Sequence, residues 1–455
     1  MAVRIPRDVG SPFNPNAPND PLDPFHPDNG AVQLAQFQGF CSDVPTDAGM
    51  LIAVNSTPVP VDAHSVRARR MLRPGFLTGA NALATPDNVL DVPVGVTPPP
   101  VFRFERQGMR VRTVSVPNLG PAVEVWSFDA DMNNNVEVNI SAWPAPTIRV
   151  REGRVMHTTL STATGPHTIH HHGIEPTAMN DGVGHLTFEI DDEYTYQWQA
   201  AEAGTYFYHC HRNTVLHFEM GMYGMLIVDP DVTGAPFVDG GAGRCYVGND
   251  LEDYAAEAIW VADDFDLRWH GIDRDGNGTA INDHNAGLQE NAVDANGMPT
   301  FVRIDDPDNP RLHDFHPDVF LVTGRPAPFG ADNALIATAP GTAITPRITR
   351  GQKLLIRTLN ASYCTTRWTF PAELPGRVIA ADGRTFGREP FGRYSSPFTL
   401  ASIDHRFEFT TARRWDILLD IPVDATPGSY FVEIGFYHWL TNERLRTVRT
   451  EIVVA

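Results

Sequence analysis

The chain has 455 residues, of which 42% are hydrophobic and 10% aromatic, enough for two or three globular domains with large cores. Its formal net charge of −20 argues against nucleic acid or an anionic membrane surface as a partner, and would raise the local concentration of cations. No apolar run approaches the ~18 residues that a transmembrane helix needs, so we expect no membrane span.

Residues 1–105 carry sixteen of the 38 prolines and show little periodicity. We expect this N-terminal extension to be an extended arm that wraps around the domains, with a short strand such as Met50–Val54. Its first twenty residues lack the apolar core of a signal peptide.

From residue 106 the pattern changes to short runs of β-branched and aromatic residues with turn signals between them. Such runs are typical of a β-sandwich, which we expect over residues 106–232. The predicted strands are Val111–Val116, Val123–Phe128, Val136–Ile140, Thr147–Val150, Leu186–Ile190, Tyr194–Trp198, Thr205–Tyr208 and Met225–Val228.

A Gly- and Asp-rich stretch follows, and we assign residues 233–257 as a linker. Residues 258–455 return to short β-rich runs and form a second predicted β domain, so the fold class is all-β. Its predicted strands are Ala258–Ala262, Val319–Val322, Lys353–Leu359, Arg377–Ala380, Phe407–Thr410, Asp416–Ile421, Tyr430–Phe436 and Thr447–Val454.

The first domain holds a cluster of metal-ligand side chains. Cys210 lies on a short loop after a predicted strand, with His217 seven residues later and Met222 five residues beyond that. Upstream, His167 stands five residues before His172. A thiolate, two imidazoles and a weak axial thioether form a blue-copper site. Each residue alone is more often a core or surface side chain, but together they predict one copper site made of His167, Cys210, His217 and Met222.

Four further histidines lie in the same segments. His170 and His172 make one His-x-His pair, and His209 and His211 make another around Cys210. Because side chains alternate between the faces of a strand, His209 and His211 should point away from Cys210. The two pairs therefore predict a second, catalytic metal site, joined to the first by a short covalent path for an electron.

These motifs resemble those of multicopper oxidases, in the laccase-like cupredoxin superfamily, with copper nitrite reductases as relatives. His167–Gly173 resembles the H-x-x-H-x-H-G motif of the family, and His209–Met222 resembles its final motif. Pro144–Gly153, Met179–Val183 and Gly204–Tyr208 also fit family phrases. The resemblance implies two Greek-key cupredoxin-like β-sandwich domains. It also assigns His167 to a mononuclear copper. The residues that it assigns to a copper cluster are His170, His172, His209 and His211.

The chain departs from the family pattern in two ways. The Cys210–His217 loop is longer than in laccases. A family trinuclear cluster takes eight imidazoles, whereas these motifs supply four, and the second domain has no ligand motif in Asn360–Phe370 or Tyr437–Trp439. That domain therefore looks copper-free at the mononuclear position. Either another subunit completes the cluster, in a homo-oligomer such as a trimer, or the cluster is incomplete.

Two minor features concern the other cysteines and a possible calcium site. Either Cys41 pairs with Cys245 in a disulfide, or these two and Cys364 are free buried thiols, and spacing does not decide. Asp273–Gly278 resembles the start of a calcium loop. The twelfth position is His284 rather than an acidic residue, so a surface turn is the better interpretation and calcium the alternative.

Three functions are compatible with the sequence. We predict a multicopper oxidase-like enzyme that takes electrons from a small reductant or metal ion and reduces dioxygen. A nitrite reductase-like enzyme is one alternative, because His172 and His209 match two of the catalytic-copper ligands in that family. A non-catalytic blue-copper electron carrier is another. Since blue-copper oxidases generally work outside the cytoplasm, we expect a periplasmic or secreted protein whose signal segment this chain does not include.

Overall fold

The computed structural model describes most of the chain from residue 102 onward. The described residues are 102–130, 143–153, 155–161, 167–174, 176, 180–183, 190, 193–200, 202–212, 214–232, 237–271, 315–389 and 392–455. Several predicted features lie outside them: the arm up to residue 101 with Met50–Val54 and Cys41, the strand Val136–Ile140, most of Leu186–Ile190, and the calcium-like loop Asp273–Gly278.

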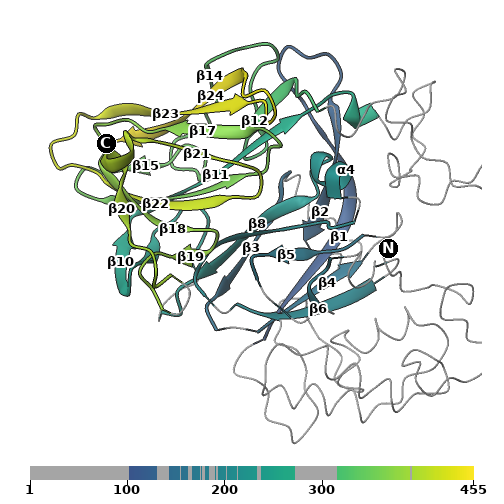
Figure 1. Ribbon diagram of the computed structural model, residues 1–455, viewed down its shortest axis with the longest axis horizontal. Helices are drawn as coiled ribbons and strands as arrows, with labels where there is room; N and C mark the ends of the chain where they lie inside the picture. Colours follow the sequence, from purple (N-terminus) through teal and green to yellow (C-terminus); the bar gives the residue numbers. More distant parts are fainter. Residues whose placement is uncertain are drawn as a thin grey trace, which may run out of the picture.

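The first half of the described chain forms two four-stranded sheets that share one core (Figure 1). The first sheet has the order β2-β1-β4-β6, with β1 (Phe102–Val114), β2 (Val123–Ala130), β4 (Val155–Ser161) and β6 (Glu193–Gln199). The second has the order β3-β8-β7-β5, with β3 (Ala145–Arg151), β5 (His170–His172), β7 (Gly204–His209) and β8 (Tyr223–Asp229). Buried side chains from both sheets, including Trp126, Trp198 and Tyr208, fill the space between them, so this half is a β-sandwich.

The second half forms a larger sandwich on the same plan. Its eight-stranded sheet contains β13 (Arg325–Pro326), β12 (Val319–Val322), β11 (Ala256–Phe265), β16 (Lys353–Asn360), β22 (Arg414–Asp420), β18 (Gly376–Ala381) and β19 (Arg384–Thr385), with β20 (Phe398–Thr399) beside β18. Its six-stranded sheet contains β14 (Ala334–Leu335), β24 (Arg444–Val454), β23 (Gly428–Tyr437), β17 (Thr365–Thr369) and β21 (Arg406–Phe409), with β15 (Arg347–Ile348) beside β24. Trp260 and Trp368 stack between the two sheets, with ring centroids 6.3 Å apart.

The all-β fold class is confirmed, but some elements differ from the prediction. The expected linker holds a hairpin of β9 (Gly243–Val247) and β10 (Asp250–Tyr254). Two strands of the first sandwich, β4 and β5, were not predicted. β4 is stabilised by pairing with β1 and β6, which are distant in sequence, and such pairing overrides local propensity. The boundaries at 106–232 and 258–455 stay predictions.

The two sandwiches pack closely against each other. On the outer face of β7 and β8, Phe207 and Met225 contact Ile259 and Leu359 of the second sandwich. β7 and β8 are therefore buried on both faces. This packing places the end of β7 against the second sandwich.

Buried ion pairs also connect the two sandwiches. Arg149 on β3 pairs with Asp229 at 2.8 Å and with Glu257 at 2.8 Å, and Arg357 pairs with the same Glu257 at 2.7 Å. Within the described part of the chain, no helix has the length and apolar character to cross a membrane.

Candidate metal centre

One set of metal-ligand atoms lies in the core of the first sandwich. Sγ of Cys210 is 3.1 Å from Nδ1 of His217 and 3.7 Å from Nδ1 of His167. The ligand atoms of these three residues lie within 4.8 Å of one another, and all three side chains are buried. We call His167, Cys210 and His217 the buried group. Two imidazole nitrogens and one sulfur suit a soft transition metal such as copper.

Backbone contacts bring these ligands together from separate segments. His167 forms an isolated β-bridge with Ile190, and Cys210 follows directly after β7. The backbone N–H of Cys210 donates to the carbonyl of Met222 at 3.0 Å. Met222 is fully buried in the same core cluster as Cys210, which suits the predicted fourth ligand, although its role stays a prediction.

The sequence predicts a loop between Cys210 and His217, but the structure shows more than a loop there. The segment contains the helix α4 (Thr214–Glu219), which carries His217 inward into the core. The edge of the buried Trp126 ring packs against His217, with ring centroids 5.5 Å apart. The extra residues relative to a laccase loop are therefore accommodated by one short helix.

Burial and a bound metal ion act on the Cys210 thiol in opposite directions. Burial raises the pKa of the Cys210 thiol to about 11, so the thiol alone would be protonated at neutral pH. A bound metal ion reverses this preference, because a coordinating thiol is deprotonated. The buried, sulfur-containing donor set therefore fits copper.

Four imidazoles gather on the other side of the same segments. The ring centroid of His170 lies 5.3 Å from those of His172, His209 and His211. Nδ1 of His172 is 3.3 Å from Nε2 of His209. We call these four residues the pocket group. His209 and His211 lie together and apart from the buried group, as strand alternation predicts.

Hydrogen bonds orient two of these rings. Nδ1 of His170 is 2.7 Å from the carbonyl oxygen of Asp181, and Nδ1 of His209 is 2.9 Å from that of Cys210. In each case the ring N–H donates to the carbonyl, which leaves Nε2 as the metal-binding nitrogen. Sequence reasoning did not single out Asp181, although it lies within the quoted motif Met179–Val183.

The pocket group is chemically ready to bind metal. Burial lowers the pKa of His209 well below its ordinary value. Burial, assisted by the nearby charge of Arg414, lowers the pKa of His172 to about 3. Both rings are therefore neutral at pH 7, which is the form that coordinates metal ions.

The middle histidine of β5 points to the opposite side. Nε2 of His171 is 3.2 Å from Oγ1 of Thr158, and its ring packs on that of Trp198 with centroids 4.8 Å apart. His171 is thus a core residue, whereas its neighbours His170 and His172 face the pocket. Alternation along three residues separates these roles.

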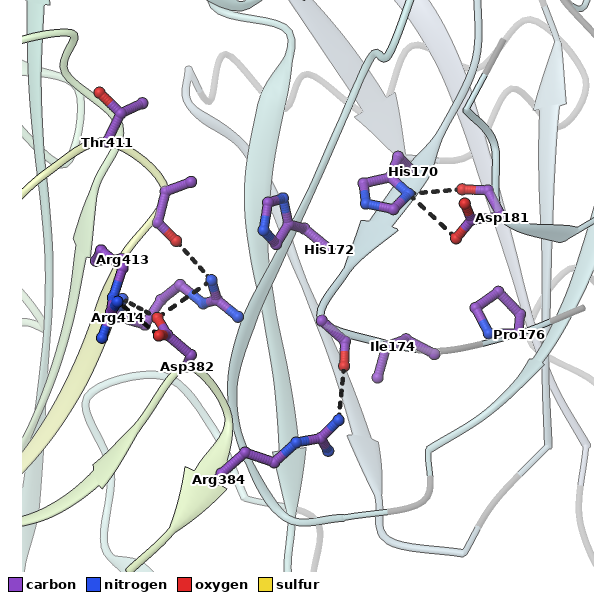
Figure 2. A pocket seen from close by; sticks show the side chains of 12 residues that line it. His170, His172, Ile174, Pro176, Asp181, Asp382, Arg384, Thr411, Arg413 and Arg414 are labelled. Carbon is purple, nitrogen blue, oxygen red and sulfur yellow. Dashed lines mark hydrogen bonds and ion pairs between the residues drawn. The ribbon is translucent and has the colours of Figure 1, made fainter. Parts of the chain in front are cut away.

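His170 and His172 of the pocket group line a pocket of about 910 Å³ between the two sandwiches (Figure 2). His170, His172 and Asp181 line it from the first sandwich, and the second sandwich contributes Asp382, Arg384, Arg413 and Arg414. No spacing pattern could have pointed to these last four residues, because only the packing of the two sandwiches brings them to the histidines.

The candidate metal groups among the described residues both lie in the first sandwich. The described part of the second sandwich contains none, and the copper-free second domain stays a prediction. Cys245 and Cys364 are buried free thiols, which is the second of the two alternatives for these residues, and Cys41 lies outside the described residues. Burial in the core favours uncharged thiols at both positions.

Comparisons with known proteins point to copper enzymes. Residues 122–233 match the family model of multicopper oxidases. Copper resistance protein A of Escherichia coli is 38% identical over 90 residues, 19% of this chain and 14% of that protein. The copper-containing nitrite reductase of Neisseria meningitidis serogroup A is 30% identical over 151 residues, 31% of this chain and 36% of that protein. The chain thus matches at most about a third of the length of these curated relatives.

Among solved structures, the blue copper oxidase from Nitrosomonas europaea is similar with a TM-score of 0.46 at 19% identity. The superposition covers 78% of this chain and 85% of that one.

Proposed function

We propose that this chain, which carries a multicopper oxidase domain over residues 122–233, is a copper oxidoreductase that reduces dioxygen with electrons from a small reductant or a metal ion. The predicted resemblance to that family is confirmed for this segment. The activity of the whole protein is our proposal, and one structural observation carries it.

That observation is the placement of two donor groups on opposite sides of one three-residue segment. Cys210 belongs to the buried group, while the neighbouring His209 and His211 belong to the pocket group. Copper bound at these groups would supply one-electron redox chemistry. The backbone of residues 209–211 is then the shortest covalent route between the two groups.

The buried group and the pocket group have different surroundings, which suit them to different roles. The buried group has no exposed ligand, so it is suited to electron transfer without contact with the substrate that is reduced. The pocket group borders a pocket that a small molecule can enter, with the partly exposed His170 and His172 at its wall. Hydrogen bonds to Asp181 and Cys210 keep the rings oriented.

A nitrite reductase-like activity is the second candidate. One set of three imidazoles, His170, His172 and His209, has its ligand atoms within 4.8 Å of one another and suits a single catalytic metal. The match to the nitrite reductase of Neisseria meningitidis also extends over 151 residues. Against this candidate, His211 adds a fourth imidazole to the pocket group, which fits an oxidase cluster better.

The proposal includes an oligomer and a place outside the cytoplasm. By the resemblance, a cluster of the family type takes eight imidazoles, and the first sandwich brings four together at His170. A second copy of the chain would have to supply the others. The periplasmic or secreted location is inferred from the resemblance alone.

The deciding experiment combines metal content with activity. Copper-reconstituted protein would be analysed for copper per chain, absorption and EPR spectra, mass in solution, and oxygen uptake with a reductant. Three or more copper ions per chain with oxygen uptake would support the oxidase. One copper ion per chain without uptake would identify an electron carrier instead. Nitric oxide released from nitrite without oxygen would identify the nitrite reductase.

A further inference from the structure

We propose that Arg413 and Arg414 bind a small anion, a carboxylate or a planar oxyanion, in the pocket in front of the pocket group. The inference deepens the proposed function and rests on it in one respect: the anion would lie beside the metal site at which dioxygen is reduced. Figure 2 shows the two arginines on one wall of the pocket, with His170 and Asp181 on the opposite wall.

Arg414 lies close to the imidazoles. Its guanidinium carbon is 5.3 Å from the ring centroid of Phe207. The same ring stacks on His172, with centroids 4.4 Å apart. Arg414 comes from the first position of β22 in the second sandwich and lines the pocket together with His172. An anion held by its guanidinium would therefore lie beside the pocket group.

The charge of Arg414 is only partly balanced. Its side chain is 3% exposed, and among the described residues its carboxylate partner is Asp382, 3.4 Å from Nη1. Asp382 also pairs with Nε of Arg413 at 2.9 Å. Two guanidinium groups thus share the Asp382 carboxylate on this wall, which leaves the wall with one positive charge in excess. Asp416, whose charge also acts on Arg414, pairs with Arg357. Asp181 lines the opposite wall. Burial lowers the pKa of Arg414 to about 10, as expected where compensation is incomplete.

The third arginine of the pocket does not add to this excess. Nη1 of Arg384 pairs with the buried carboxylate of Glu202 at 3.3 Å, and its Nη2 donates to the carbonyl of Gly173 at 3.4 Å. Arg384 therefore closes the lower edge of the pocket in Figure 2 as a neutral pair.

Donor groups for an anion remain on both arginines. Nε of Arg414 donates to the carbonyl of Thr205 at 3.4 Å and its Nη1 to that of Ala412 at 2.5 Å. Within the described residues, no hydrogen bond or ion pair uses Nη2 of Arg414 or either Nη of Arg413. Guanidinium N–H groups in this arrangement match the two oxygens of a carboxylate or a planar oxyanion.

The position of this site contrasts with the rest of the protein. The chain has a formal net charge of −20, so its surface as a whole repels anions. A pocket wall with excess positive charge next to a metal site would attract an anion to one place only. The negative charge of the anion would balance the positive charges of Arg414 and of the metal together.

The test measures anion binding by isothermal titration calorimetry on the copper-loaded chain and on the metal-free chain. The probes are acetate and nitrite, and acetamide serves as the uncharged match for acetate. We expect one site per chain for each anion and no binding of acetamide. Arg413→Gln and Arg414→Gln should each weaken binding about tenfold, since each loses a charged donor. Arg393→Gln, an exposed arginine paired with Glu389, is the control and should bind like the wild type.

Several results would overturn the proposal: neither anion binding to the wild type, Arg413→Gln binding like the wild type, or Arg393→Gln losing as much affinity as Arg413→Gln. Arg413 is 47% exposed, so its variant is not expected to disturb folding even if Arg414→Gln does. Anion binding by a chain whose copper-loaded form fails to take up oxygen would uphold the anion site and reject the proposed function. If nitrite binds more tightly than acetate, or acetate more tightly than nitrite, the proposal is supported, and the tighter ligand identifies the class of anion.

Discussion

The buried group and the pocket group use the same short segments but have opposite surroundings. Every side chain of the buried group is shielded from solvent, whereas His170 and His172 of the pocket group border a pocket of about 910 Å³. Residues 209 to 211 separate the two groups, because Cys210 belongs to the buried group while His209 and His211 belong to the pocket group. The contrast indicates that one backbone segment can support an electron-transfer site and a ligand-binding site at once.

The largest effect should come from removing the thiolate of the buried group. In copper-loaded protein, Cys210→Ser should abolish the intense blue absorption completely, because that colour requires a copper–thiolate bond. Cys245→Ser, which changes a buried free thiol outside both groups, should keep the colour. Absorption spectra of the two variants at equal copper content provide the comparison. Blue colour surviving in Cys210→Ser would show that the buried group is assigned incorrectly.

Removing ligands of the pocket group should leave the copper site of the buried group intact. His170→Ala combined with His172→Ala should lower the copper content by at least one ion per chain and stop oxygen uptake, while the blue absorption remains. The blue site keeps its own ligands, which lie across the sheet. His438→Ala in the second sandwich is the control and should keep both copper and activity. An unchanged copper content in the double variant would contradict the existence of a second site.

A third prediction concerns how the helix of the buried group responds to acid. Glu219 at the end of α4 lies 3.4 Å from Nε2 of His270, whose Nδ1–H donates to the carbonyl of Glu124 at 2.6 Å. Burial lowers the pKa of His270 to about 4. The unfolded chain takes up this proton near pH 6.5 but the native protein only near pH 4, so the free energy of unfolding should fall as pH falls through this window.

The size of this effect follows from the two pKa values. Between pH 7 and pH 4, His270 should cost the metal-free wild type about 3 kcal/mol of unfolding free energy. His270→Gln keeps a donor for Glu124 but cannot titrate, so its loss of stability should be smaller by that amount. Urea denaturation of both proteins at several pH values measures the difference. Parallel pH profiles would show that His270 does not contribute.

The metal-ligand residues could be predicted from the sequence because they lie in local motifs. Cys210 and His217 are seven residues apart, and the alternation of His209, Cys210 and His211 sets their directions without any tertiary information. The helix α4 was missed since its six residues are too few to show a periodic pattern. Tertiary packing of His217 and Leu216 into the core stabilises it instead.

Other features depend on contacts between distant segments. Arg414 reaches the histidines because β7 and β8 pack against the second sandwich, which no local pattern reveals. The hairpin β9–β10 did carry a signal, Gly248-Asn249 between two strands, which is typical of a two-residue turn. The Gly- and Asp-rich composition around it masked this turn, and the segment was predicted as a linker.

The smallest expected effect tests how closely the arginine wall approaches the histidine motif. Gly173 follows the pocket group directly and has a φ of +91°, which disfavours any side chain. A Cβ at this position would lie 2.7 Å from Nη2 of Arg414 and 2.9 Å from Cδ1 of Tyr206. Gly173→Ala should therefore add a steric cost to the backbone cost and displace Arg414 from the pocket.

Gly153 offers a matched control, because its φ of +78° is similar and a Cβ there would meet nothing within 4 Å. Gly153→Ala should carry only the backbone cost of about 1 kcal/mol. Gly173→Ala should be less stable than Gly153→Ala by about 1 kcal/mol or more in urea denaturation, and should also bind acetate more weakly. Equal stability and equal acetate affinity in the two variants would mean that Arg414 is not held against the histidine motif. In that case an anion near the pocket group would have to bind without help from Arg414 of the second sandwich.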